Sequence, residues 1–177
     1  MTDDVKKRLD VVLVAGGKYH DIDFARLELL KLLAEDDRIR TRVYEDYSNL
    51  HAISNADFLI TYTCDVRPTL EQQKVLRDFV ANGKRWLALH GTNSILQFLS
   101  DGRVDCPRVA PIFMETLGSQ FLSHPPIEPY TVTVADGNHH LVEGVEPFET
   151  NDELYLMETH GELHVLLETE FEGNTPG

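Results

Sequence analysis

Apolar runs alternate with helical patterns through the first hundred or so residues, and this alternation constrains the fold most strongly. The run LDVVLVAGG (residues 9–17) is continuously apolar and ends in two glycines, which is typical of a strand buried on both faces. We predict further strands at 41–47, 56–63 and 85–90, and helices over 23–36 and 70–81. Strands separated by helices imply right-handed parallel crossovers. The sequence therefore predicts an α/β fold with a mainly parallel sheet and helices on both faces.

The second half of the chain is less regular. A helix-compatible stretch follows residue 90, and one short helix is expected before Pro125. The alternating run YTVTVAD (residues 130–136) predicts an antiparallel or edge strand, and residues 137–149 predict a loop. Two further strands are predicted at 153–158 and 163–170, and FEGNTPG at the end is predicted to be a turn.

The composition limits the possible partners. At 177 residues the chain is expected to be a single domain, 1–177, with a formal charge of −14 that disfavours nucleic acid and anionic membranes. Two cysteines, Cys64 and Cys106, suit a reducing compartment, and we find neither a signal peptide nor an apolar run long enough to span a membrane. We expect a cytoplasmic protein that binds a small molecule, and a homodimer because homodimers are the commonest oligomers.

Three segments should meet at the carboxyl edge of the predicted sheet, where open α/β sheets bind ligands. They are Gly16–Asp21, Tyr62–Asp65 and His90–Asn93. The strand that ends at Leu89 runs straight into His90 and Gly91, which is the layout of a nucleophile elbow. Such elbows carry serine or cysteine, whereas this one carries histidine, so we expect an acid, base or metal-ligand role for His90.

Other histidines and acids follow predicted strands or stand in loops. His20 and Asp21 follow the first strand, His124 precedes a stiff Pro-Pro pair, and Asp152 and Glu153 precede Tyr155 in NDELY. His139 and His140 share one turn, and the sequence does not decide which of them faces a site. No HExxH and no cysteine-rich zinc spacing is present, so a metal site would have to be assembled from distant segments.

Several motifs together resemble the ThuA-like (trehalose-utilisation) family. They are VLVAGGKYHD, ADFLITYT, TLEQQKVLRDFVANGKRWLALHG, LGSQFLSHPP and VADGNHHLVEGVEPFETNDELY, which occur in the family's order over about residues 10–156. The resemblance implies a flavodoxin-like three-layer sandwich similar to class I glutamine amidotransferases. It also implies that His90 replaces their catalytic cysteine, so cysteine-dependent glutamine hydrolysis is not expected. Family members extend further at the carboxyl end, so we expect either a missing C-terminal segment or a short member.

The resemblance also implies an enzyme of carbohydrate metabolism that acts on a disaccharide or keto-sugar derivative. The family usually has proline after the histidine of GNHHLVEG, which favours His139 over His140. In one version of the site, a divalent metal, most readily zinc, is bound by histidines, and an acid serves as base. In the other version, His90 is the general acid or base without a metal. A non-catalytic sugar- or metabolite-binding module is the alternative to an enzyme.

The candidate residues fall into three groups. The expected catalytic residues are His90, His20, Asp21, Asp152 and Glu153. The expected substrate-binding residues are Gly17, Tyr19, Gly91, Thr92 and Tyr155. The expected metal ligands are His20, His90, His124 and His139.

Overall fold

The structure, a computed structural model, describes residues 7–170, and the chain divides into two compact units. The first unit comprises residues 1–117 and the second comprises residues 118–177. The assignment of the whole chain to one domain stays a prediction, and the predicted turn FEGNTPG lies outside the described residues.

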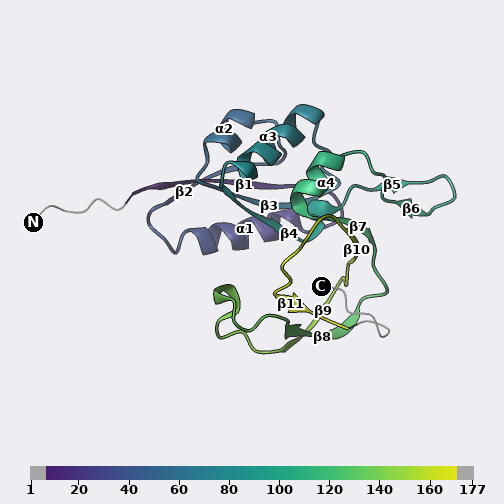
Figure 1. Cartoon of the computed structure of the whole chain (residues 1–177). Helices are drawn as coiled ribbons and strands as arrows, with labels where there is room; N and C mark the ends of the chain where they lie inside the picture. The colour runs from purple at the N-terminus through teal and green to yellow at the C-terminus, as the bar shows by residue number, and fades with distance from the viewer. Residues whose placement is uncertain (1–6, 171–177) are drawn as a thin grey trace, which may run out of the picture. The chain divides into compact units, whose positions relative to one another are not determined.

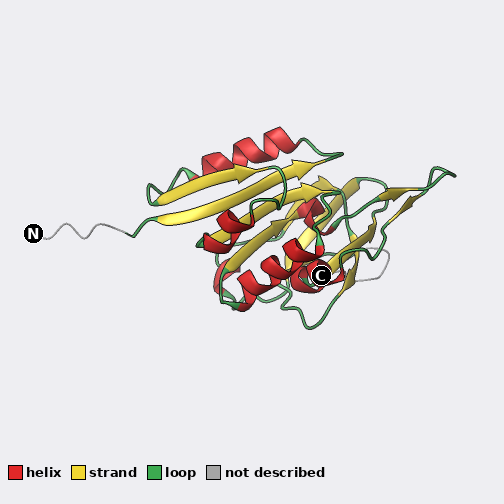
Figure 2. Cartoon of the chain, turned by 90° about the horizontal axis from the view of Figure 1, so that it is seen from above, coloured by secondary structure: helices red, strands yellow, loops and turns green. Residues whose placement is uncertain are grey.

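The first unit is built on a four-stranded parallel sheet with the strand order β2-β1-β3-β4 (Figure 1). The strands are β1 (Leu9–Gly17), β2 (Ile39–Tyr44), β3 (Phe58–Cys64) and β4 (Arg85–Leu89). Figure 2 shows the strands of this unit side by side, seen from above. Because all four strands run in the same direction, the loops that follow them meet at one edge of the sheet.

Helices cover both faces of this sheet, and the predicted α/β fold with a parallel sheet is confirmed. Helix α1 (Ile22–Leu33) lies on one face, and helices α2 (Leu50–Asn55) and α3 (Leu70–Ala81) lie on the other (Figure 1). Helix α4 (Pro111–Leu117) packs beside α3. Val11, Leu13 and Ala15 of β1 pack in the core with α1, while Val12 and Val14 pack in the core of the opposite face. Alternate residues of one strand thus serve two cores.

Local capping explains where the longer helices begin. The Asp21 carboxylate accepts a hydrogen bond from the Phe24 backbone N–H at 2.9 Å and caps α1. Thr69 and Gln72 form a capping box at the start of α3, which occupies the predicted range 70–81. Along α1, Leu29, Leu30 and Leu33 pack against the sheet, whereas Phe24 is 62% exposed.

The structure differs from the prediction in the connections. The six-residue helix α2 was not predicted, and it begins at Leu50 after the cap Asn49, whose side chain accepts from the Ala52 N–H. Residue 90 begins only a short 3-10 helix, η1 (His90–Asn93), where a longer helix was expected. The chain then forms the hairpin β5 (Gln97–Phe98) and β6 (Val104–Asp105), which was not predicted.

The second unit is made of antiparallel strands. Strand β7 (Ser119–Ser123) pairs with β10 (Leu156–Thr159), and β8 (Glu128–Val134) lies between β11 (Leu167–Glu168) and β9 (Phe148–Asp152). The antiparallel strand predicted at 130–136 is confirmed, although β8 is the central strand of its sheet. Strand β9 begins within the predicted loop 137–149, and the 3-10 helix η2 (His140–Val142) also forms there.

Within residues 7–170, no helix combines the length and the apolar character that crossing a bilayer requires.

Candidate functional site

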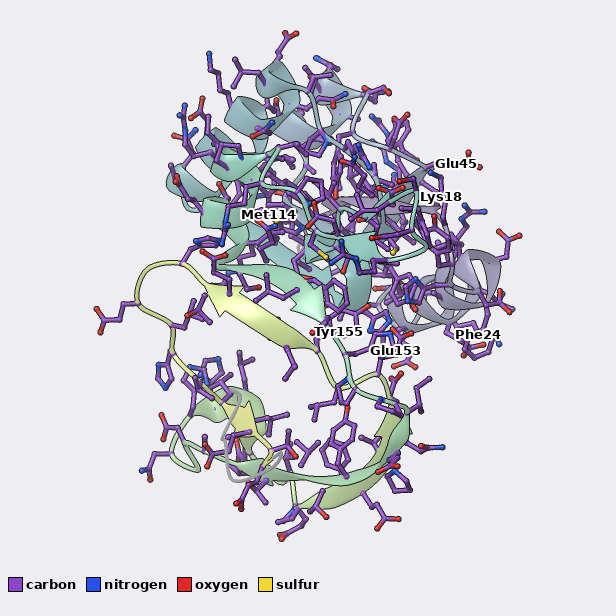
Figure 3. All side chains as sticks on the ribbon, turned by 90° about the vertical axis from the view of Figure 1, so that its right-hand side faces the viewer. Lys18, Phe24, Glu45, Met114, Glu153 and Tyr155 are labelled. Carbon is purple, nitrogen blue, oxygen red and sulfur yellow. The ribbon has the colours of Figure 1, made fainter. Side chains whose placement is uncertain are left out.

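The turn after β1 delivers His20 to the carboxyl edge of the sheet. Gly16 and Gly17 are needed there for space: a Cβ on Gly16 would lie 2.0 Å from the Glu45 carbonyl oxygen. A Cβ on Gly17 would lie 1.9 Å from the Cys64 carbonyl oxygen, and Gly17 has a φ of +109°. Tyr19 is left-handed as well, with a φ of 71°. Figure 3 shows Lys18 and Glu45, which follow the neighbouring strands β1 and β2, at this edge.

The turn after β4 has the backbone strain of an elbow. His90 has a φ of 46°, an uncommon conformation for a residue with a side chain. Gly91 follows it against β3, where a Cβ would lie 2.9 Å from the Thr63 carbonyl oxygen. The neighbouring Thr92 hydroxyl donates to the Leu89 carbonyl at 2.8 Å and lies 3.1 Å from the Thr61 hydroxyl. The close packing of Gly91 and Thr92 on β3 fixes the direction in which His90 points.

His20 and His90 meet although 69 residues separate them. Their Nε2 atoms lie 2.8 Å apart, and the ring planes are nearly perpendicular, at 89°. Tyr62, near the end of β3, stacks on His90 with ring centroids 5.8 Å apart and an interplanar angle of 16°. The first unit thus gathers two imidazoles and a phenol from the ends of three adjacent strands.

The hydrogen bonds of the pair assign its tautomers. His20 Nδ1 lies 3.3 Å from the Lys18 carbonyl oxygen, which can only accept, so His20 Nδ1 carries a proton. In a neutral His20 ring, Nε2 then has the lone pair and accepts the proton of His90 Nε2. A histidine that donates its other N–H to a backbone carbonyl has the arrangement usual for a metal ligand.

A buried carboxylate follows β3 and contacts the loop that carries His20. Asp65 follows β3, its side chain is only 5% exposed, and its carboxylate lies 2.9 Å from Lys18 Nζ. Burial raises the pKa of Asp65, but the hydrogen bonds from Lys18, the Leu96 N–H and Arg67 outweigh it and leave the pKa below its usual value. The hydrogen bond to Asp65 in turn raises the pKa of Lys18. Asp65 therefore stays ionised over the whole physiological range.

An exposed aromatic pair adjoins His20 in the chain. The rings of Tyr19 and Phe98 lie 5.6 Å apart, and the two residues are 58% and 57% exposed. Phe98 belongs to the β5–β6 hairpin, so the pair joins two loops of the first unit. Such a surface suits contact with the apolar face of a ring in a ligand.

Two other predicted residues of the first unit have structural partners. Asp21 caps α1, which uses one of its carboxylate oxygens. Thr92 is 3% exposed and its hydroxyl donates to the Leu89 carbonyl, and its role in binding substrate stays a prediction. Gly17 and Gly91 contribute close backbone packing, and their role in binding substrate stays a prediction.

In the second unit, His124 and Glu153 lie near each other. His124 Nδ1 lies 2.8 Å from the Pro125 carbonyl oxygen, and His124 Nε2 lies 3.7 Å from a Glu153 carboxylate oxygen. Tyr155 packs on Phe121 with ring centroids 4.4 Å apart, and Figure 3 labels Glu153 and Tyr155 in the segment between β9 and β10. Asp152 accepts from the Glu153 N–H at 2.8 Å. The catalytic and binding roles of these residues stay predictions.

His139 is held as a cap. Its Nδ1 accepts from the Leu141 N–H at 3.2 Å, so binding a metal through Nε2 would require the proton to move to Nδ1 and would break this cap. His164, 5.1 Å away between ring centroids, has its Nε2 2.8 Å from Asp136. Among the described residues of the second unit, no three His, Cys, Asp or Glu side chains bring ligand atoms within 4.8 Å of one another. The role of His139 as a metal ligand stays a prediction.

The sequence did not assign a role to Tyr62, Lys18, Asp65 or Phe98. The segment Tyr62–Asp65 was expected at the sheet edge, and that position was the signal for Tyr62 and Asp65. The ion pair between Lys18 and Asp65 joins two loops 47 residues apart, which no local pattern encodes. Phe98 stands on a two-residue strand too short to predict.

The comparisons with known proteins agree with this architecture. The sequence matches the ThuA family, described as trehalose utilisation, over residues 10–176. A solved structure described as ThuA-like, from Bacteroides uniformis, superposes with a TM-score of 0.72 at 17% identity, covering 93% of this chain and 69% of that one. Another from Parabacteroides merdae gives a TM-score of 0.63 at 16% identity, covering 92% and 68%. No curated protein sequence matches the chain. At these identities the solved structures bear on the fold alone, while the family match spans nearly the whole sequence, and the chain therefore belongs to the ThuA family.

Proposed function

We propose that this protein is an enzyme that acts on a carbohydrate derivative, such as a disaccharide or a keto-sugar, and that His20 and His90 bind a divalent metal ion in its active site. The observation that carries the proposal is the 2.8 Å approach of the two Nε2 atoms at the carboxyl edge of the sheet. The family's description, trehalose utilisation, supports the class of substrate.

The two histidines suit such an ion in chemistry and in spacing. Two nitrogens bound to one tetrahedral zinc ion at about 2.05 Å lie roughly 3.3 Å apart, so the pair needs to open by only about half an ångström. The contact between His20 Nδ1 and the Lys18 carbonyl orients the His20 Nε2 lone pair toward His90. The stacked Tyr62 ring restricts rotation of the His90 imidazole.

When bound, the ion supplies Lewis-acid polarisation of a substrate oxygen. The protein's own groups orient the substrate and move protons. The two Nε2 atoms are already within hydrogen-bond distance of each other. In the version without a metal, His20 Nε2 accepts a proton from the substrate and His90 Nε2 donates one to it. Asp152 and Glu153 remain the predicted acids, and a Glu153→Gln variant assayed beside His90→Ala tests that assignment.

Glutamine hydrolysis by a cysteine nucleophile is not part of the proposal. The elbow position holds an imidazole, and Cys64 is on β3, where it is 2% exposed. A buried thiol without an elbow lacks the access that a nucleophile needs.

A non-catalytic sugar-binding protein is the second candidate, and the exposed pair Tyr19–Phe98 favours it. This pair offers ring contacts without any reactive group. The absence of nucleic-acid and membrane partners also stays a proposal, supported by the net charge of −14. A cytoplasmic location stays a proposal supported by the two free cysteines, and a homodimer one supported only by the frequency of homodimers.

The test combines metal analysis with turnover. Protein purified without chelator or His-tag is analysed by elemental mass spectrometry, beside His90→Ala, and then incubated with disaccharides and their keto derivatives while products are followed by NMR. We expect about one equivalent of metal and substrate turnover in the wild type, and loss of both in His90→Ala. Turnover without bound metal supports the version in which the histidines act as acid and base. Tight sugar binding without turnover overturns the proposal of an enzyme and supports a sugar-binding protein.

A further inference from the structure

Asp65 is a buried, charged residue that the proposed function does not use. Its side chain is 5% exposed and its backbone φ is 55°, so the chain maintains both a desolvated carboxylate and an uncommon conformation at this position. Keeping a carboxylate away from water is costly unless several donors satisfy it. The donors to Asp65 come from three segments of the first unit, and two of them are connected to His20 or His90.

The first connection leads to His20. The Asp65 Oδ2 atom lies 2.9 Å from Lys18 Nζ, and the Lys18 backbone N–H donates to the Cys64 carbonyl at 3.0 Å. Lys18 is thus attached to the end of β3 at both its side chain and its main chain. Its carbonyl oxygen is the group that faces His20 Nδ1 and selects the His20 tautomer.

The second connection leads to His90. The Asp65 Oδ1 atom accepts from the Leu96 N–H at 3.1 Å, and the Asp65 N–H donates to the Ser94 carbonyl at 2.9 Å. The Ser94 N–H donates in turn to the Gly91 carbonyl at 2.9 Å, which closes the turn that begins at His90. The main chain and the side chain of Asp65 therefore both hold the segment after β4.

Arg67 completes the set of donors. Its Nε lies 3.2 Å from Asp65 Oδ1, and its guanidinium also donates to the Leu96 carbonyl. Two cations and one backbone N–H facing one carboxylate explain why Asp65 is charged while nearly buried. A neutral side chain at this position would leave Lys18 without its acceptor.

We propose that Asp65 is a positioning residue for the His20–His90 pair, because its carboxylate joins the loop that carries His20 to the loop that carries His90. The inference rests on the proposed function for its catalytic meaning, since Asp65 acts through Lys18 and the segment Ser94–Leu96. It does not depend on which substrate is used. Its loss should disturb the imidazole pair more than it disturbs the fold.

The sharpest variant is Asp65→Asn. The amide keeps the shape and one oxygen, which can still accept from the Leu96 N–H, but its NH₂ group then faces the Lys18 ammonium, donor against donor. Lys18→Met removes the same contact from the other side and keeps the Lys18 carbonyl. The control is Asp101→Asn, because Asp101 accepts from Arg103 in an exposed turn of the same unit.

The experiment measures histidine tautomers by ¹⁵N NMR and zinc affinity by calorimetry on the full chain, with thermal unfolding alongside. In the wild type we expect His20 as a single tautomer protonated at Nδ1 and His90 protonated at Nε2. Asp65→Asn and Lys18→Met should each average the His20 tautomers and weaken zinc binding about 10-fold or more, and the double variant should add little. Asp101→Asn should resemble the wild type in both measurements.

The two readouts separate this inference from the proposed function. A wild type that does not bind zinc contradicts the metal site, yet the tautomers still report on Asp65. If Lys18→Met and every folded Asp65 variant keep the wild-type tautomers and bind zinc within about twofold of the wild type, the positioning role is overturned. If Asp65→Asn does not fold, Lys18→Met alone decides the question by the same criteria.

Discussion

The two units hold their histidines in different ways. In the first unit, His20 and His90 stand on turns packed against a parallel sheet, and their Nε2 atoms meet at 2.8 Å. In the second unit, His139 caps a 3-10 helix and His164 pairs with Asp136 at an exposed site. Parallel strands bring their carboxyl ends to one edge, so residues far apart in sequence converge there. A cluster of histidines therefore depends on their position at the carboxyl edge of a parallel sheet more than on how many histidines the loops contain.

Substituting a turn glycine in each unit should give the largest difference in the free energy of unfolding. We expect Gly17→Ala to lower the free energy of unfolding by about 3 kcal/mol or more, since the new Cβ would overlap the Cys64 carbonyl oxygen in addition to the left-handed strain. Gly144→Ala in the second unit has the strain, at φ +76°, but nothing within 4 Å, and should cost about 1–2 kcal/mol. Urea unfolding of both variants measures this, and equal losses would contradict the packing role of Gly17.

Removing one histidine from each unit tests which unit binds zinc. His20→Ala should weaken zinc binding about 100-fold or more, because loss of a ligand exceeds the effect of losing an outer partner. His139→Ala should change the zinc affinity less than about twofold, since its Nδ1 is engaged with the Leu141 N–H. Calorimetric titration of both variants decides this, and a larger loss in His139→Ala would reverse the assignment.

Low pH should change the stabilising contribution of Asp65 in the first unit more than that of Asp136 in the second unit. The pKa of Asp65 is lowered in the folded state, so its stabilising contribution is present above its unfolded pKa of about 3.9 and is lost as the pH falls through the lower folded value. Asp65→Asn should therefore be less stable than the wild type at about pH 6, and this deficit should shrink toward about pH 2.

The matched variant in the second unit is Asp136→Asn. The hydrogen bond from His164 lowers the pKa of Asp136, but this pair is solvent-exposed and screened, so we expect little change in stability at any pH. Urea unfolding across the pH range compares the two variants. An Asp65→Asn deficit that does not change with pH would show that its charge is not the stabilising feature.

The smallest expected effect belongs to His164. Its ion pair with Asp136 is exposed, with 62% of the His164 side chain accessible, so His164→Ala should shift the unfolding free energy by less than about 0.5 kcal/mol. Thermal unfolding measures this directly. A loss of several kcal/mol would mean that the exposed ion pair of His164 stabilises the second unit, contrary to this comparison.

Local signals explain which elements could be predicted from the sequence. Strand β1 and helix α3 have the predicted bounds because two glycines end the first and a capping box begins the second. Helix α2, with six residues, is too short to show a helical period. Strand β7 was missed because it forms by pairing with the distant strand β10, and β5 was missed because its two residues are too few to show an alternating pattern.

The two histidines of the candidate site could be predicted, and their contacts could not. The sequence places His20 and His90 at the same edge because parallel strands end at one edge of their sheet and because of the elbow layout. Their tautomers depend on the Lys18 carbonyl, and their approach depends on Gly17, Gly91 and Asp65, which act through contacts across the sheet. Such contacts follow from the folded geometry rather than from any spacing in the chain.

Histidine-resolved ¹⁵N NMR during a zinc titration tests the central claim most directly. We predict that the first equivalent of zinc changes the Nε2 signals of His20 and His90, with His20 keeping its tautomer and His90 changing from Nε2–H to Nδ1–H. The signals of His139 and His164 should stay unchanged at that stage. A first equivalent that shifts His139 or His164, or that shifts no histidine of the first unit, would contradict the account.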